Sequence, residues 1–272
     1  MSAEFHKELT SAYDRLFCVP EFGLDGQPGA GFGNLGYFTP ATTDLNTACG
    51  QLMDVLMARI TRRDGLILDV ACGVGGTTKC LTKIFAPEAI HGINISARQI
   101  ELCRTRVPEA HFQVMTAEKM DFPDQIFDVV ISVEAAMHFK GRREFLLEAM
   151  RVLKPGGEIV VADMPFCSEP SSFTRVLGGQ ELYPNLDSYR ALWESCGIQD
   201  VEIEDVSGPV WRGFCAHVRN TAFRDLIAGV TDGGTFQERL HFAEKMNALP
   251  VLAYVIVKGR KGQKGVSSHD GR

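Results

Sequence analysis

The residues best placed for ligand chemistry lie in one short string, Asp69-Val-Ala71-Cys-Gly73-Val-Gly75-Gly76, which follows an apolar run. A glycine turn between a buried strand and a helix lets backbone approach a ligand closely, because a side chain there would collide with it. A carboxylate before the glycines repels a pyrophosphate and suits a cationic amino-acid group. The string therefore favours a ligand with a positively charged amino-acid end over a dinucleotide. The alternative is that the glycines only form a tight turn.

A second set of polar residues follows a later apolar run, where Val133 and Glu134 are followed by His138. Ligands bind at the carboxyl edge of a parallel sheet, so we expect all three residues near a ligand. If the segment forms a helical turn, the i, i+4 spacing places Glu134 and His138 on one face as an acid/base pair. The alternatives are a structural His138, bonded to backbone, and a Glu134 that orients His138 or the N-terminal loop.

A third set closes the second apolar run, Gly92-Ile-Asn94-Ile95-Ser96. Many nucleotide-binding folds place an acidic residue here to bind ribose hydroxyls, and this chain offers Asn94 instead. Gln99 lies three residues after Ser96, which is the spacing of a capping box at a helix start. We therefore expect Asn94, Ile95 and Gln99 in a cofactor site, with capping as the alternative role for Gln99.

The string from Asp69 to Gly76 resembles the first motif of the class I S-adenosylmethionine-dependent methyltransferases, which reads LDxGCGxGG. The resemblance extends over residues 66–164 and is closest to the small-molecule group, which includes natural-product, sarcosine, tocopherol and sterol methyltransferases. Ala71 stands where the family usually has its first glycine. The Gly92–Gln99 string is similar to a G-x-x-x-S-x-x-Q variant of the same group. The resemblance implies S-adenosyl-L-methionine as cofactor, bound in part by Asp69, Ala71, Gly73 and Gly75.

Other strings resemble further parts of this family. The segment containing Ala117 and Glu118 resembles the one that packs against the adenine, and S-x-E-x-x-x-H at residues 132–138 resembles a motif whose histidine is associated with the active site. Tyr37 belongs to a string similar to N-x-G-Y-W, which folds over the cofactor and would bring its ring near the sulfonium. Tyr13 resembles a second lid tyrosine that contacts substrate. The alternative for Tyr13 is an aromatic anchor of an N-terminal helix.

These residues require a sheet that brings several strand ends together. Short apolar runs alternate with longer amphipathic stretches between Leu66 and Met164, a pattern that predicts βαβ units and a parallel sheet. With the family resemblance, it predicts an α/β fold: a Rossmann-like, seven-stranded, mostly parallel sheet with helices on both faces and a helical cap or lid. The expected strands are 66–70, 89–93, 112–114, 127–133, 159–162, 201–206 and 251–257, and the expected helices are near 45–60, 96–106, 142–153 and 214–247.

The chain divides into three expected parts. Residues 1–65 form an N-terminal lid and helix over the cofactor, 66–258 form the core, and 259–272 form a disordered tail with almost no apolar residue to bury. Segments 167–197 and 207–247 are expected substrate caps. Their aromatic residues favour an apolar pocket, in which Phe166 and Trp193 would bind substrate, although aromatic residues at helical spacing are more often part of a core.

Composition excludes several classes of protein. The 272 residues include 28 Lys and Arg against 34 Asp and Glu, and a net charge of -6 argues against a nucleic-acid partner. The eight cysteines form no CxxC pair, which favours reduced thiols in the cytoplasm and no metal site. The sequence contains no run of about 18 apolar residues, so it predicts no membrane span. We expect a monomer or homodimer that binds a small-molecule acceptor.

The sequence therefore predicts methyl transfer from S-adenosyl-L-methionine to an O, N or C atom of a small, apolar or amphipathic metabolite. In-line displacement mainly requires correct positioning of donor and acceptor, which can lower the activation free energy by about 7–11 kcal/mol. Three alternatives use the same residues differently. Glu134 would deprotonate a carbocation during C-methylation of an isoprenoid or lipid alkene, the chain would be a non-catalytic cofactor-binding partner, or the sheet would bind NAD in an oxidoreductase.

Overall fold

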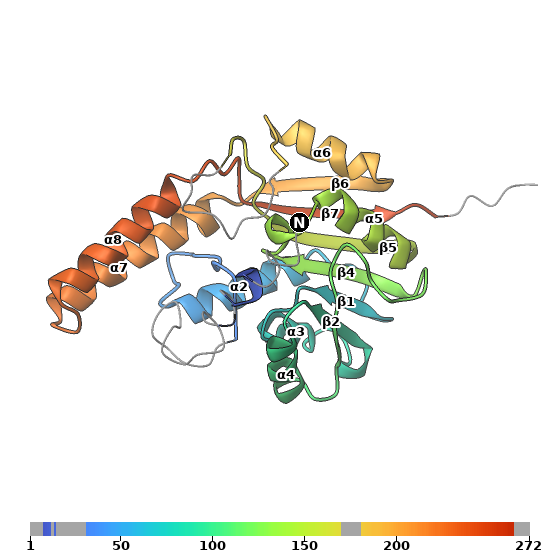
Figure 1. Ribbon diagram of the computed structural model, residues 1–272, viewed down its shortest axis with the longest axis horizontal. Coiled ribbons are helices and arrows are strands. Elements are labelled where there is room, and N and C mark those ends of the chain that lie inside the picture. Colours follow the sequence, from blue (N-terminus) through green and yellow to red (C-terminus); the bar gives the residue numbers. More distant parts are fainter. Residues whose placement is uncertain (1–7, 12–13, 15–30, 170–180, 264–272) are drawn as a thin grey trace, which may run out of the picture.

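The computed structural model describes residues 8–11, 14, 31–169 and 181–263. These residues form one seven-stranded sheet, which confirms the predicted α/β, Rossmann-like fold class (Figure 1). Its strands are β1 (Ile67–Val70), β2 (Ile90–Asn94), β3 (His111–Val114), β4 (Phe127–Val133), β5 (Leu153–Asp163), β6 (Ile198–Asp205) and β7 (Val255–Lys261). Their order across the sheet is β3-β2-β1-β4-β5-β7-β6. The first five are parallel, and β7 is antiparallel to both of its neighbours.

Continuous apolar sequence places the central strands in the interior. Every residue of β1 is buried, as are the first six residues of β4, because helices cover both faces of the sheet. Successive side chains point to opposite faces, so Ile67 packs in one core and Leu68 in the other. The first core includes residues of α2 (Leu45–Met57), α3 (Gly76–Leu81) and α4 (Ala97–Arg106), and the second includes residues of α5 (Arg142–Val152) and α6 (Leu186–Ser195).

The strand order creates a crevice between β1 and β4. From β1 the chain continues to β2 and β3 on one side, then returns to β4 on the other side of β1. At such a switch point the connections leave the carboxyl ends of the two strands in opposite directions, which opens a ligand site between them. The three predicted sets of polar residues all follow strands at this edge.

Two helices form a hairpin that extends away from the sheet, as Figure 1 shows at its left. They are α7 (Gly213–Ile227) and α8 (Gly233–Asn247), which pack mainly against each other, and a π-helical segment Gly208–Arg212 leads into α7. The base of the hairpin packs on α2 through Phe214, Leu45 and Cys49. Its tip exposes Ile227 and Val230, which are 84% and 71% exposed.

A buried ion pair fixes the end of β5. Arg142 at the start of α5 donates from Nε to Asp163 Oδ2 at 2.6 Å, and its Nη2 lies 3.2 Å from Oδ1. Tyr189 on α6 donates its hydroxyl to the same carboxylate at 2.6 Å, and the Tyr183 ring lies 5.8 Å from the guanidinium. Arg142 and Asp163 are 4% and 0% exposed. The nearby guanidinium holds the pKa of Asp163 below its ordinary value despite burial.

Two expectations about the outer segments are wrong. The strand β7 continues to Lys261, where Gly259 and Arg260 pair with β5, so the expected disordered tail began too early in the chain. Backbone pairing explains the difference, since a strand between two neighbours needs few apolar side chains. The expected cap at 167–197 includes α6, which instead packs on β6 as a helix of the core layer.

Candidate active site

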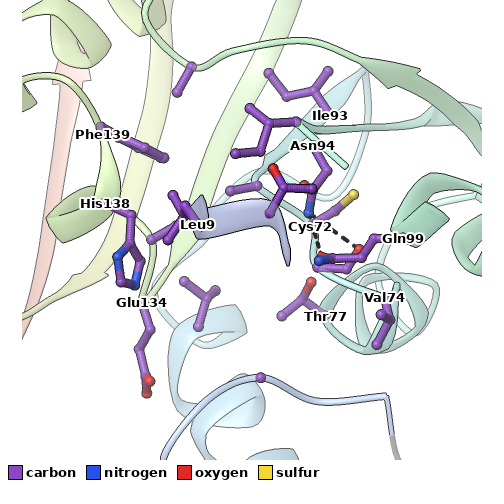
Figure 2. A pocket seen from close by; sticks show the side chains of 18 of the residues that line it. Leu9, Cys72, Val74, Thr77, Ile93, Asn94, Gln99, Glu134, His138 and Phe139 are labelled. Carbon is purple, nitrogen blue, oxygen red and sulfur yellow. Dashed lines mark hydrogen bonds between the residues drawn. The ribbon is translucent and has the colours of Figure 1, made fainter. Parts of the chain in front are cut away.

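A cavity opens at the carboxyl edge of the sheet, over β1, β2 and β4 (Figure 2). Its volume is about 990 Å³, including the part open to solvent. His138 and Phe139 lie on one wall, opposite Asn94 and Gln99. Ten of the residues predicted from sequence line it: Ala71, Gly73, Asn94, Ile95, Gln99, Ala117, Glu118, Val133, Glu134 and His138.

The glycine loop brings backbone directly to the cavity. Gly73 has φ of +55°, and a Cβ added there would meet no atom within 4 Å, so open space adjoins its backbone. Gly75 begins α3 with φ of +88°, and a Cβ there would lie 3.2 Å from the Cys103 sulfur. Gly75 is not among the cavity-lining residues, so its expected ligand contact is replaced by a turn-forming and packing role.

Asp69 supports the loop and is not among the residues that line the cavity, so its direct contact with the cofactor stays a prediction. The carboxylate is 1% exposed and accepts hydrogen bonds from the hydroxyls of Thr77 at 2.8 Å and Thr78 at 2.7 Å. These donors lie in the first turn of α3, where they reach the end of β1. Burial raises the pKa of Asp69 to about 6, although the two hydroxyls act in the opposite direction.

The end of β2 carries a hydrogen-bond network. Asn94 donates from Nδ2 to Gln99 Oε1 at 3.1 Å and accepts at Oδ1 from the Ser96 amide at 3.0 Å. Ser96 caps α4, and both its hydroxyl and the Gln99 amide donate to Asp14, at 2.7 and 3.0 Å. Asp14 thus joins the N-terminal segment to this strand end. Gln99 lines the cavity and also lies in the first turn of α4. Both positions predicted for it, in the cofactor site and at a helix start, are therefore the same place in the structure.

The end of β4 joins three parts of the chain at Glu134. Its Oε1 accepts from the Leu35 amide at 2.8 Å and from the Tyr254 hydroxyl at 2.6 Å. Burial raises the pKa of Glu134 to about 7, while both hydrogen bonds lower it by smaller amounts. Figure 2 shows its carboxylate directed away from Asn94 and Gln99.

The expected helical turn with Glu134 and His138 on one face is wrong. Glu134 has φ of 53°, and a 3-10 helix begins only at Ala136 and ends at His138. A left-handed residue cannot continue a right-handed turn, so the two side chains diverge. His138 lines the cavity, and the Glu134 carboxylate contacts Leu35 in the N-terminal segment and Tyr254, the residue directly before β7.

Three predicted aromatic contacts also differ from the structure. Tyr37 packs against the core beside α2, and its amide donates to Ala48 O at 2.8 Å. Phe166 and Trp193 are each 1% exposed within the cores, and none of the three lines the cavity. Burial of a large apolar ring explains Phe166 and Trp193, whereas Tyr37 is only partly buried. Tyr13 lies outside the described residues.

Sequence reasoning missed several residues of the cavity wall. Leu9 and Thr10 come from the N-terminal helix. Gly31, Gly33 and Asn34 come from residues 31–36, the N-terminal cover, which lies over the glycine loop. This segment is held by the Gly76 amide, which donates to Gly31 O at 2.9 Å. The available signal was its glycine-rich composition, which indicates close backbone approach.

The contact at Gly76 leads to a testable expectation. A Cβ there would lie 2.1 Å from Gly31 O, so Gly76→Ala must displace the cover from the loop. Overpacking of this kind costs about 1–3 kcal/mol, and we expect the affinity for S-adenosylhomocysteine to fall about tenfold in calorimetric titration. Gly233→Ala is the control, because a Cβ there meets nothing within 4 Å. Unchanged affinity in Gly76→Ala would show that the cover does not contribute to binding.

Comparison with known proteins assigns the class of this site. Residues 68–161 match the family model described as methyltransferase domain. A 27-O-demethylrifamycin SV methyltransferase of Amycolatopsis mediterranei (strain S699) is 28% identical over 244 residues, which cover 83% of this chain and 88% of that protein. A phthiotriol/phenolphthiotriol dimycocerosates methyltransferase of Mycobacterium leprae (strain TN) is 38% identical over 59% of this chain and 54% of its own length. Other curated relatives align over only 31% and 37% of their length.

Among solved structures, the cyclase SpnF matches 95% of this chain and 97% of its own, with a TM-score of 0.72 and 21% identity. That likeness shows the fold alone, since one fold hosts different reactions. Fold, family match and site together define a class I methyltransferase with a Rossmann-like core. The methyl donor of this class is S-adenosyl-L-methionine.

None of the helices in residues 8–11, 14, 31–169 and 181–263 is long and apolar enough to cross a membrane. Within the same residues, no group of three or more His, Cys, Asp or Glu side chains could hold a metal ion.

Proposed function

We propose that this enzyme methylates a hydroxyl oxygen of a small, apolar or amphipathic metabolite by in-line displacement. The observation that carries the proposal is the imidazole of His138 in the cavity wall, beside Phe139 and opposite the polar end of β2. A hydroxyl acceptor must lose a proton, and histidine is the commonest general base near neutral pH. The relative that aligns over most of both chains is named for an O-demethylated compound, which supports an oxygen acceptor.

The cavity fits S-adenosyl-L-methionine in two respects. Open space adjoins the backbone of Gly73, and the buried Asn34 amide nitrogen has no hydrogen-bond partner among the described residues. Asn94 and Gln99 would hold the ribose, since their amide groups lie at the end of β2. Ala117 and Glu118, beyond β3, would hold the adenine. Bound there, the cofactor supplies an electrophilic methyl group.

The remaining work of the site is positioning and proton removal. The N-terminal cover is held over the glycine loop by Gly76 and Glu134, where it would limit the access of water to the bound cofactor. Apolar side chains of Leu9, Val133 and Phe139 line the same cavity and suit an apolar acceptor. His138 would accept the hydroxyl proton at an imidazole nitrogen.

Replacing His138 with glutamine tests this proposal. General-base catalysis contributes roughly 100-fold or more, so we expect His138→Gln to release S-adenosylhomocysteine about 100-fold more slowly with a hydroxyl-bearing acceptor. Binding of S-adenosylhomocysteine by calorimetry should change less than about twofold, because the imidazole acts on the acceptor. His241→Gln, on the exposed face of α8, is the matched control.

A panel of hydroxyl, amine and alkene acceptors separates the alternatives. Methylation of an alkene could persist in His138→Gln and be lost in Glu134→Gln. That outcome would replace the present proposal with C-methylation through a carbocation. The geometry argues against that role, because Oε1 of Glu134 is already engaged by Leu35 and Tyr254 and the carboxylate is directed away from Asn94 and Gln99 (Figure 2).

A further inference from the structure

The side chain of Asn34 has an unusual position in the cavity wall. It is 2% exposed and lines the cavity, yet its Nδ2 has no hydrogen-bond partner among the described residues. Buried amide donors are almost always paired in folded proteins, so a donor of this kind indicates a partner that binds later.

The amide is held in one orientation. Asn34 Oδ1 accepts from the Gly36 amide at 3.0 Å, which identifies the other end of the amide group as the nitrogen. The Asn34 carbonyl accepts from the Cys49 thiol at 3.2 Å. A Cβ on Gly36 would lie 2.5 Å from the Ala48 Cβ, so the segment fits closely against α2 and cannot shift toward it. Asn34 is therefore preorganised to donate in a fixed direction.

Neighbouring contacts place this donor at one end of the cavity. Gly31, on one side of Asn34, bonds to Gly76 at the start of α3, and Leu35, on the other side, bonds to Glu134 at the end of β4. Asn34 thus lies over the β1/β4 crevice. The proposed ribose and adenine contacts lie at the ends of β2 and β3, on the opposite side of β1.

We propose that Asn34 Nδ2 donates a hydrogen bond to the carboxylate of the amino-acid end of S-adenosyl-L-methionine, and that Asn34 is a positioning residue for the methyl donor. The inference rests on the proposed placement of ribose and adenine, which leaves the amino-acid end over the β1/β4 crevice. An N–H donor pairs with the carboxylate, whereas the ammonium and the sulfonium of the same ligand offer it no acceptor.

The test compares two probes in calorimetric titration. S-adenosylhomocysteine carries the amino-acid end, and 5′-methylthioadenosine lacks it but keeps the adenine and ribose. Asn34→Asp preserves an acceptor for the Gly36 amide and replaces the donor with an anionic oxygen, which would repel the ligand carboxylate. We expect S-adenosylhomocysteine to bind about 10- to 100-fold more weakly, the range for loss of a hydrogen bond to a charged group, while 5′-methylthioadenosine changes less than about twofold.

Two further variants control the experiment. Asn34→Ala removes the donor without adding charge and should show the same selective loss for S-adenosylhomocysteine. Asn220→Asp makes the matched chemical change on the exposed face of α7 and should alter neither affinity. Equal losses for both probes, or no loss for either, would overturn the role of Asn34 alone. Failure of the wild-type protein to bind 5′-methylthioadenosine would overturn the placement of ribose and adenine as well.

Discussion

Arg142→Leu is expected to lower the free energy of unfolding by about 3–5 kcal/mol, because it leaves the carboxylate of Asp163 buried without its cation. Asp163 is 0% exposed, and the remaining donors are the Tyr189 hydroxyl and the Met164 amide. Neither donor carries a charge. The substitution also removes the guanidinium from the face of the Tyr183 ring.

Urea unfolding of Arg142→Leu at neutral pH measures this loss. The control is Arg143→Leu, the next residue of α5, whose guanidinium is exposed and bonds to the Ser195 hydroxyl at 2.8 Å. Exposed substitutions of this kind change stability within about 0.5 kcal/mol. Equal effects of the two leucine variants would mean that the ion pair at the end of β5 does not stabilise the fold.

Glu134→Gln is expected to remove part of the pH dependence of stability. The folded-state pKa of Glu134 is raised from 4.5 to about 7, so the folded protein binds a proton that the unfolded chain has lost in this window. The resulting stabilisation is complete below pH 4.5 and is lost as pH rises through about 7. Its size is up to about 3 kcal/mol, and glutamine, which does not titrate, should abolish the change.

Unfolding free energies at pH 5 and pH 8 for both proteins provide the measurement. The wild-type protein should lose more stability between these values than Glu134→Gln does. Asp69, with its pKa raised to about 6, contributes a loss of the same sign in both proteins and cancels in the comparison. Parallel pH profiles would show that the Glu134 carboxyl titrates at its ordinary pKa in the folded protein.

Strands and helices were predictable where a single local rule decides the structure. The run at residues 66–70 is apolar except for Asp69, which is typical of a strand covered on both faces, and β1 is such a strand. Ser96 followed by Gln99 predicted the start of α4, and the Ser96 hydroxyl caps that helix. Gly259 and Arg260 escaped prediction because their strand is set by pairing with distant residues, which a local pattern does not contain.

The site was predictable at the strand ends and in the short segments that follow them. Asn94 and His138 line the cavity because the carboxyl ends of parallel strands meet at one edge. Trp193 belongs to an i, i+4 pair with Tyr189 on α6, and this helical spacing indicates core, as the structure has it. Asn34 belongs to the string similar to N-x-G-Y-W, which predicted a segment over the cofactor. The orientation of its side chain depends on contacts of this segment with α2 and with the end of β4, which are distant in sequence.

The helical hairpin of α7 and α8 begins and ends at neighbouring points of the sheet, because Asp205 at the end of β6 pairs with Val255 at the start of β7. The length of the hairpin is therefore independent of β1, β2 and β4, the strands below the cavity for the methyl donor. Insertions and deletions in the hairpin are therefore expected to leave the register of the sheet unaltered. The connection between β6 and β7 can diverge in length and sequence while the sheet that carries the cavity stays constant.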